Sequence, residues 1–158
     1  MLPVKIKEIM VDLAMNPVLL VVDKKEERAL PIVVGHFEAY SISLAVEGVD
    51  YMRPLTHDLI KTLCDKLGGK LTKIVITDMK NNTYYAELHI KEQNKEVIID
   101  ARPSDAIAFA LRANAPIFLS EKVEKLMVKI NELFSEEKQK MIKEMLKDAA
   151  QMDKKLLH

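Results

Sequence analysis

Two short stretches of the chain place an arginine, a proline and an acid together at the expected start of a helix. They read RPLTHD at residues 53–58 and ARPSDA at residues 101–106. Proline fits the first turn of a helix, and an acid there is stabilised by the positive end of the helix dipole. The acids are Asp58 and Asp105, and a further acid, Asp100, stands just before the second stretch. These residues either brace the two corners or form part of a site.

The structural interpretation needs only local contacts. Thr56 and Ser104 are of the type that caps helix N-termini, and Arg53 and Arg102 can pair with the acids of their own stretches. Under this interpretation the two corners carry no chemistry.

The functional interpretation is that these acids converge with His57 and with Glu38 from an earlier segment. Carboxylates and a histidine can hold Mg²⁺ or Mn²⁺, which prefer hard oxygen ligands. A metal held in this way can activate water and stabilise the charge on a phosphoryl group, with an arginine assisting. The candidate catalytic residues are Glu38, His57, Asp58, Asp100 and Asp105, and the candidate metal ligands among them are Glu38, Asp58 and Asp105.

The composition limits the possible partners. Its 24 Lys and Arg balance 24 Asp and Glu, whereas proteins that bind nucleic acid usually carry a basic excess. Any nucleic acid must therefore meet a local patch or a metal held by acids. A lone cysteine excludes a disulfide framework, and no leader or membrane-spanning apolar run is apparent. We expect a cytoplasmic protein with no membrane segment.

The same order of elements is expected twice along the chain. Alternating or continuous apolar runs, the first with a phase change near Glu8 that indicates a β-bulge, predict three strands and then a helix in each half. Aligning the halves places Glu38 on Asp105. We expect an α+β fold with a mixed or antiparallel sheet, built from a duplicated βββα unit at residues 4–48 and 71–115 with a linking helix at 56–67.

The chain is expected to divide into a domain at residues 1–119 and a helical extension at 120–158. The run VLLVV at 18–22 is continuously apolar, as in a strand covered on both faces. Because such a strand needs cover and the extension carries a Met-rich stripe, we expect a homo-oligomer such as a dimer. Deleting residues 135–158 should then weaken assembly more than it harms the fold.

Four stretches, taken together and in this order, resemble the bifunctional nuclease domain family. They are LPIVVGHFEAYSISLAVEGV at 30–49, RPLTHDLIKTLCDKLGG at 53–69, NTYYAELHI at 82–90 and IDARPSDAIAFALRANAPIFLSE at 99–121. The resemblance implies an α+β fold, oligomeric assembly and nuclease activity on DNA and RNA. Phe37 precedes the acid of the first stretch where the family often has a small residue, and its bulk would narrow a site there.

By motif match the resemblance also implies which residues matter. They are Glu38, Arg53, Thr56, His57, Asp58, Asp100, Arg102, Ser104 and Asp105. Arg53, Arg102 and Ser104 would bind the substrate, with Arg102 as the phosphate clamp, and His57 would be a metal ligand or a proton carrier.

Two functions from different classes follow from these observations. The first is a metal-assisted phosphodiesterase acting on DNA and RNA. The second is a non-catalytic oligomeric binding or regulatory module, whose polar corners bind a small anion or a protein partner. Acids that lie apart, or that are all paired with arginines, would favour the second function.

Overall fold

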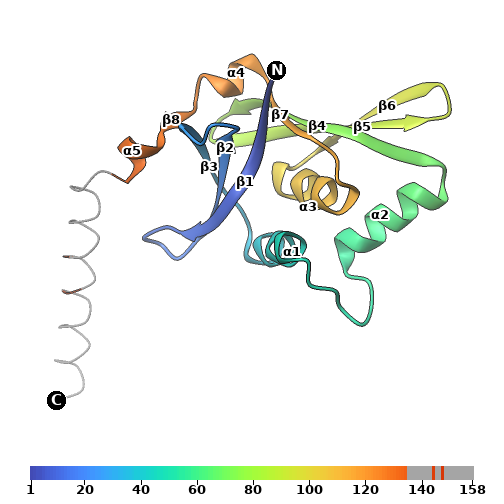
Figure 1. Cartoon of the computed structure of the whole chain (residues 1–158), viewed down its shortest axis with the longest axis horizontal. Helices are drawn as coiled ribbons and strands as arrows, with labels where there is room; N and C mark the ends of the chain where they lie inside the picture. Colours follow the sequence, from blue (N-terminus) through green and yellow to red (C-terminus); the bar gives the residue numbers. More distant parts are fainter. Residues whose placement is uncertain (135–143, 145–146, 148–158) are drawn as a thin grey trace.

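The computed structural model describes residues 1–134, 144 and 147, and within them the chain forms one eight-stranded mixed sheet (Figure 1). In spatial order the strands are β6-β5-β4-β7-β1-β2-β3-β8. Their bounds are β1 Leu2–Val11, β2 Pro17–Asp23, β3 Arg28–Val33, β4 Gly69–Lys80, β5 Thr83–Glu92, β6 Lys95–Ala101, β7 Ile117–Leu119 and β8 Val128–Lys129. All neighbouring strands whose pairing is described are antiparallel except β4 and β7, which are parallel.

Three longer helices lie together on one face of this sheet (Figure 1). They are α1 His36–Glu47, α2 Thr56–Lys66 and α3 Pro103–Ala113, and α3 contacts both of the others. Two short helices follow, α4 Glu121–Glu124 and α5 Ile130–Leu133. The predicted α+β class is therefore confirmed. Most of the predicted extension, residues 135–158, lies outside the described residues apart from two single positions.

Each half of the sheet is an antiparallel meander that runs outward from β7, through β4-β5-β6 on one side and β1-β2-β3 on the other. A helix follows the third strand of each meander, α1 in the first half and α3 in the second. This order is compatible with the expected repeat, while the equivalence of the two units stays a prediction. The strand β7, which joins the halves, was not anticipated from the sequence.

The strand β2 is buried on both faces, as its apolar run predicts. Leu19 and Val21 belong to the main core under the helices, whereas Leu20 and Val22 belong to a second cluster on the opposite face. That second cluster is covered by Ile130, Leu133 and Phe134 of the same chain, together with Met10. Because the chain covers β2 itself, this strand gives no reason for assembly, contrary to the expectation from its sequence.

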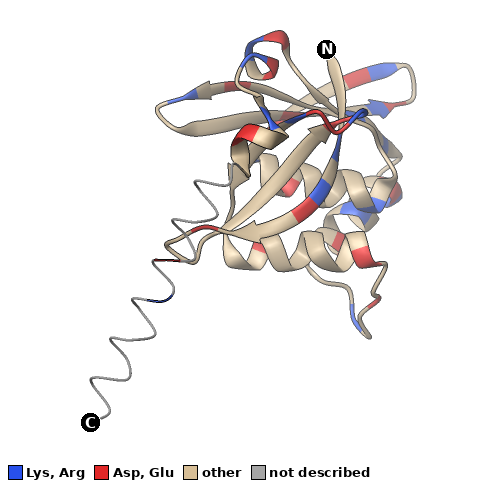
Figure 2. Ribbon diagram, turned by 60° about the vertical axis from the view of Figure 1, so that its left-hand side comes forward, with Lys and Arg blue, Asp and Glu red and all other residues tan. Residues whose placement is uncertain are grey.

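Along the described ribbon in Figure 2, Lys and Arg positions are interspersed with Asp and Glu positions. Among the described helices, none combines the length and the apolar character needed to cross a membrane.

The cover over the second cluster can be tested with two leucines of one strand. Leu19→Ala and Leu20→Ala should each lower the free energy of unfolding by about 2–5 kcal/mol, because each leaves a cavity in a closed core. Denaturant unfolding of both variants beside the wild type measures this. A loss below about 1 kcal/mol for Leu20→Ala alone would mean that α5 does not close the outer face.

Candidate functional site

The first turns of α1, α2 and α3 meet, and their polar side chains form one hydrogen-bonded cluster. Arg102, the N-cap residue of α3, donates from Nε to Asp105 Oδ2 at 2.6 Å. Its Nη2 donates to Glu38 Oε1 at 2.8 Å and to Asp105 Oδ1 at 3.1 Å. One guanidinium therefore holds the acids of two helices. Its side chain is 65% exposed, so it remains in contact with solvent.

His57 connects this arginine to the interior of the helical layer. Its Nε2 lies 2.9 Å from Asp105 Oδ1 and its Nδ1 lies 2.7 Å from Ser41 Oγ, and both His57 and Ser41 are buried. An ionised Asp105 can only accept, so Nε2 donates to it. When His57 is neutral, Nδ1 then accepts from the Ser41 hydroxyl. With both ring nitrogens engaged, His57 positions Asp105 and does not itself face solvent.

The electrostatics of the acids follow from these contacts. Burial opposes ionisation of Asp105, but the hydrogen bonds from Arg102 and His57 outweigh it and hold its pKa below the ordinary value. The pKa of Glu38 is also lowered, first by its own backbone N–H and then by Arg102. The Glu38 carboxylate folds back over Gly35, where a Cβ atom would overlap Oε2. A side chain at position 35 would therefore require the Glu38 carboxylate to move.

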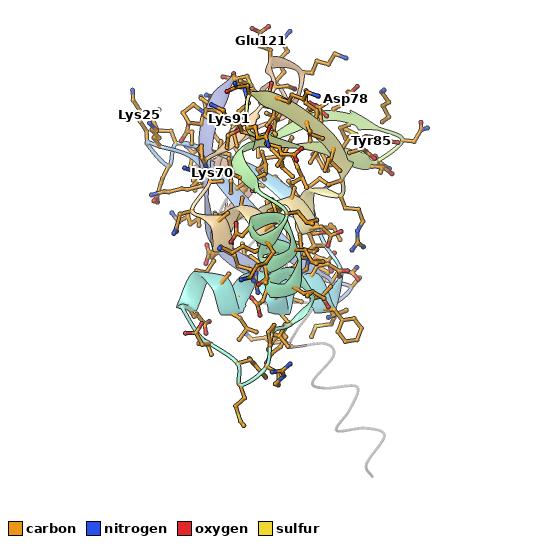
Figure 3. The ribbon with its side chains drawn as sticks, turned by 90° about the vertical axis from the view of Figure 1, so that its right-hand side faces the viewer. Lys25, Lys70, Asp78, Tyr85, Lys91 and Glu121 are labelled. Atoms are coloured by element: carbon orange, nitrogen blue, oxygen red, sulfur yellow. The ribbon has the colours of Figure 1, made fainter. Side chains whose placement is uncertain are left out.

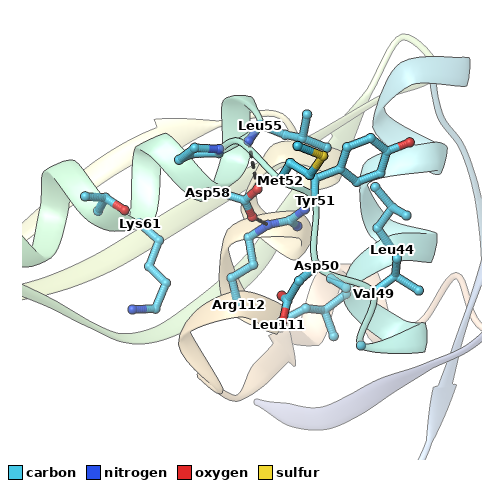
Figure 4. Close-up of a pocket in the computed structure, with 14 residues that line it drawn as sticks. Leu44, Val49, Asp50, Tyr51, Met52, Leu55, Asp58, Lys61, Leu111 and Arg112 are labelled. Carbon is cyan, nitrogen blue, oxygen red and sulfur yellow. Dashed lines mark hydrogen bonds and ion pairs between the residues drawn. The ribbon is translucent and has the colours of Figure 1, made fainter.

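Arg112, in the last turn of α3, is a site residue that the sequence analysis missed (Figure 4). It donates from Nε to Asp58 Oδ1 at 2.6 Å, from Nη1 to the Ala108 carbonyl at 2.9 Å, and from Nη2 to the Ser41 carbonyl at 3.2 Å and Ser41 Oγ at 3.1 Å. Only 10% of its side chain is exposed. In the sequence alone, Arg112 is a basic residue near the end of a predicted helix, and the favourable interaction with the helix dipole there is sufficient to account for it. Its partners lie 54 and 71 residues away.

Asp58 is fully engaged as well. Its Oδ2 accepts the backbone N–H of Leu55 at 2.8 Å, and Leu55, not Thr56, is the N-cap residue of α2. Burial raises the pKa of Asp58, but the hydrogen bonds from Arg112 and Leu55 lower it by more, so its pKa lies below the ordinary value. The expected capping role of Thr56 is wrong, because the helix already begins at that residue. The backbone N–H of the N-cap residue, Leu55, is satisfied by Asp58. Ser104 likewise stands inside α3, where Arg102 holds the N-cap position.

The remaining candidates lie outside the cluster. Asp100 is an exposed residue of β6 that pairs with Glu87, and Arg53 is exposed on the segment before α2. Among the described residues, no hydrogen bond or ion pair joins either of them to Glu38, Arg102 or Asp105. Ser104 is buried in the first turn of α3. The structure thus brings together five of the predicted residues: Glu38, His57, Asp58, Arg102 and Asp105.

The donor set does not fit a divalent metal in this arrangement. Glu38 Oε1 and both oxygens of Asp105 accept from Arg102, and both oxygens of Asp58 are engaged by Arg112 and Leu55. Within the part of the chain that the structure describes, no three histidine, cysteine or acidic side chains come together as a metal site would require. The cation between Glu38 and Asp105 is the guanidinium of Arg102.

This arrangement of helix starts is built from the stretches around Glu38, Asp58 and Asp105. The family model described as "Bifunctional nuclease domain" matches residues 18–130, which include all of them. The chain belongs to the bifunctional nuclease domain family. Each helix start of the cluster is therefore part of the family domain and not of an appendage.

Several curated proteins are similar to this chain. An uncharacterized protein of Mycobacterium tuberculosis (strain ATCC 25618 / H37Rv) is 43% identical over 108 residues, which cover 68% of this chain and 64% of that protein. Bifunctional nuclease 2 of Arabidopsis thaliana is 32% identical over 91 residues, covering 56% of this chain and 28% of its own length. Bifunctional nuclease 1 of Oryza sativa subsp. indica is 25% identical over 111 residues, covering 68% and 34%. The match thus spans less than two thirds of each of these relatives.

The lowered pKa of Asp105 predicts a pH dependence of stability. A group whose pKa is lower in the folded state stabilises the fold above its ordinary pKa, 3.8 here, and loses this contribution as the pH falls through the folded value. Asp105→Asn should cost about 1–3 kcal/mol at neutral pH, because it weakens contacts to Arg102 and His57. The difference from the wild type should shrink below pH 4. Urea unfolding from pH 7 to pH 3 measures this, and Asp100→Asn, on exposed β6, should behave as the wild type throughout.

Arg112 should contribute strongly to the stability of the fold, because it contacts all three long helices. Arg112→Lys keeps the charge but cannot reach Asp58, Ser41 and the Ala108 carbonyl at once. We expect a loss of about 1–3 kcal/mol in the free energy of unfolding, since the buried Ser41 and the Ala108 carbonyl lose their donors. Arg53→Lys, on the exposed segment, is the matched control and should change little. Equal stability of the two variants would show that the Arg112 contacts do not hold the helices together.

Proposed function

We propose that this chain is a nuclease that hydrolyses phosphodiester bonds of DNA and RNA. The observation that carries the proposal is Arg102, a solvent-exposed guanidinium at the N-terminus of α3 held between two ionised carboxylates. Membership of the bifunctional nuclease domain family supports it. So do the names of the plant relatives, which are called bifunctional nucleases. A guanidinium binds phosphate in the same two-pronged manner in which it binds carboxylate.

In this proposal Arg102 exchanges its carboxylate partners for a phosphate of the nucleic acid. Its exposed side chain can turn outward without opening the core, while His57 keeps Asp105 in place through Nε2. Asp105 is then freed from its strongest cation, can orient a water molecule toward the phosphorus and can accept its proton as the new P–O bond forms. The P–O bond to the leaving sugar oxygen breaks, and that oxygen takes a proton from solvent. Arg102 stabilises the charge that develops on the phosphoryl oxygens. Glu38 guides the return of Arg102, and Arg53 and Ser104 remain proposed contacts of the substrate.

Dependence on Mg²⁺ or Mn²⁺ remains a prediction. A divalent ion would have to replace Arg102 between Glu38 and Asp105, where two carboxylates would face it. No step of the proposed chemistry is therefore assigned to a metal, and metal dependence is one arm of the assay below.

A second candidate function is favoured by the pairing of the acids. Each carboxylate of the cluster accepts from an arginine, which is the arrangement expected of a brace between helices. On this view the chain is a non-catalytic oligomeric binding or regulatory module, and Arg102 binds a small anion or a partner. Both candidates include a homo-oligomer in the cytoplasm, which we propose from the sequence and not from the fold.

A cleavage assay separates the two candidates. Purified wild-type protein should cut labelled single-stranded DNA and RNA, and Arg102→Ala should lower kcat/KM by roughly 10²–10³-fold, as the loss of a charge-stabilising donor does elsewhere. The assay is run with Mg²⁺, with Mn²⁺ and with a chelator. Lys25→Ala, in the exposed turn between β2 and β3 (Figure 3), is the matched loss of a positive charge and should keep full activity.

The outcomes of this assay are distinct. Cleavage that is equal in the wild type and Arg102→Ala, or absent under all three conditions, contradicts the nuclease proposal and leaves the binding module. Activity that survives the chelator but falls with Arg102→Ala supports metal-free chemistry. Activity that needs the metal and falls with Asp105→Asn, in protein shown to be folded, returns Glu38 and Asp105 to the role of ligands.

A further inference from the structure

A hollow with a volume of about 330 Å³ lies beside Arg102. Three segments line it: residues 31–35 at the end of β3, residues 82–84 at the start of β5, and residues 102–104 at the start of α3. Its volume falls at the lower end of the range in which proteins hold small molecules, about 300–1,000 Å³. Glu38 and Asp105 are not part of its lining, so the hollow shares only Arg102 with the hydrogen-bonded cluster.

The lining combines one cation with neutral side chains. Of the described residues that line the hollow, Arg102 alone is charged and Tyr84 alone is aromatic. Prolines and aliphatic side chains of β3 and α3 supply most of the rest, and Asn82 adds an amide. Ser104 also lines it, although only 6% of that residue is exposed. A ligand that fits this lining has a negative charge at one end and a neutral body with a flat apolar part.

Arg102 keeps hydrogen-bonding capacity for such a ligand. A guanidinium carries N–H donors on Nε, Nη1 and Nη2, and the contacts to Glu38 and Asp105 use Nε and Nη2. Among the described residues, Nη1 has no hydrogen-bond partner, so it is available to an anion before either carboxylate is released. The backbone N–H of Ser104 lies in the first turn of α3, where N–H groups have no acceptor within the helix and suit a phosphate.

We propose that the hollow binds one nucleotide of a single-stranded nucleic acid, with its phosphate on Arg102 and its base against Tyr84. The phosphate meets the one cation of the lining, and the uncharged planar base meets the neutral part. A base is free to enter only when it has left the stack of its own strand, which makes a single strand the substrate in preference to a duplex. The inference rests on the proposed function, because it assigns to Arg102 a phosphate of the nucleic acid.

Tyr84 is held in place before a base arrives. It is partly buried and packs against the main core, while another part of its surface lines the hollow. Because its ring is already ordered, contact with a base costs little conformational entropy. Burial also raises the pKa of its phenol, so the ring stays neutral at physiological pH. Stacking on an aromatic ring tolerates every base, which suits a protein that acts on both DNA and RNA.

Two other occupants fit the lining less well. An inorganic anion would use Arg102 and leave Tyr84, Ser104 and the apolar walls without a contact. A phosphorylated peptide carries backbone amides along its whole length, and these need partners when they are buried. The hollow offers one compact neutral space beside its cation, which matches a sugar and a base.

Two ligands and two forms of one side chain isolate the contact with the base. Ribose 5-phosphate is adenosine monophosphate without its base, and Tyr84→Leu keeps apolar bulk without a ring. The wild type should bind adenosine monophosphate roughly 5–150-fold more tightly than ribose 5-phosphate, equivalent to about 1–3 kcal/mol of stacking. Tyr84→Leu should lose this preference and keep the wild-type affinity for ribose 5-phosphate. Isothermal titration calorimetry of the full chain gives the four dissociation constants, and their non-additivity measures the contact.

Tyr85→Leu is the matched control. It removes the same ring one residue further along β5, where the side chain lies on the other face of the strand, 5.7 Å from Lys80 Nζ (Figure 3). This variant should keep the full preference, as should Tyr84→Phe, which retains the ring. A wild type that binds both ligands equally, or binds neither, contradicts the inference. So does a Tyr84→Leu variant that weakens both ligands to the same degree, as a purely structural role would.

A photochemical cross-link in the wild type does not depend on how a variant folds. A single-stranded oligonucleotide that carries bromouracil in place of thymine should attach on irradiation to Tyr84, which mass spectrometry of the digested protein locates. The same sequence as a duplex should attach far less. Attachment confined to the other tyrosines, or equal attachment of the single strand and the duplex, would place the base elsewhere and overturn the inference.

Failure of this inference is distinguishable from failure of the nuclease proposal. Binding and cross-linking are measured with a chelator present and need no cleavage. A preference for adenosine monophosphate that depends on Tyr84, in a protein that cuts neither DNA nor RNA, supports the hollow and removes the nuclease. Cleavage by a wild type that binds both small ligands equally supports the nuclease and removes the hollow as a base site.

Discussion

The helical layer depends on one continuous chain of charged hydrogen bonds. It runs from Glu38 through Arg102, Asp105, His57 and Ser41 to Arg112 and Asp58, and each link joins two of the three long helices or closes a helix start. At its buried members, His57 and Ser41, such a network is strong when every partner is satisfied and costly when one is missing. Apolar packing around Ile42 and Ile107 also holds the helices to the core, and this line of side chains adds the polar contacts between their first turns.

The chemistry of the cluster is constrained because each of its carboxylates already accepts a hydrogen bond from an arginine. A carboxylate that accepts from an arginine is a weak base and a poor metal ligand, because its negative charge is already neutralised. Chemistry at this cluster must therefore begin with the release of an arginine. Arg112 is buried and holds three helices, whereas Arg102 is largely exposed and bridges only two side chains. The exposed arginine is the one that can move, and the buried one keeps the cluster assembled while it does.

Local pattern was sufficient to predict much of the fold. The bulge near Glu8 appears as a register shift between Ile6 and Glu8, and the VLLVV run lies inside the protein. Local patterns did not predict the contacts between distant segments. These are the partners of Arg112, the pairing of the three-residue strand β7, and the packing of α5 over β2. The cap of α2 was misassigned because the helix already begins at Thr56, so the N-cap position falls on Leu55.

The two halves of the chain contribute unequally to the cluster, although each begins its helix with an acid in the first turn. Glu38 of α1 and Asp105 of α3 stand in equivalent turns, but the arginine that holds both comes from the second half alone. In the first half Gly35 stands as the N-cap where α3 has Arg102, and the Glu38 carboxylate folds into the space that this glycine leaves. The first half thus supplies one hydrogen-bond acceptor, Glu38, whereas the second supplies an acceptor, Asp105, and the donor, Arg102. Because Arg102 needs both acceptors, the cluster exists only when α1 and α3 pack side by side. The linking helix α2 locks that packing through His57, which contacts Asp105, and Asp58, which contacts Arg112.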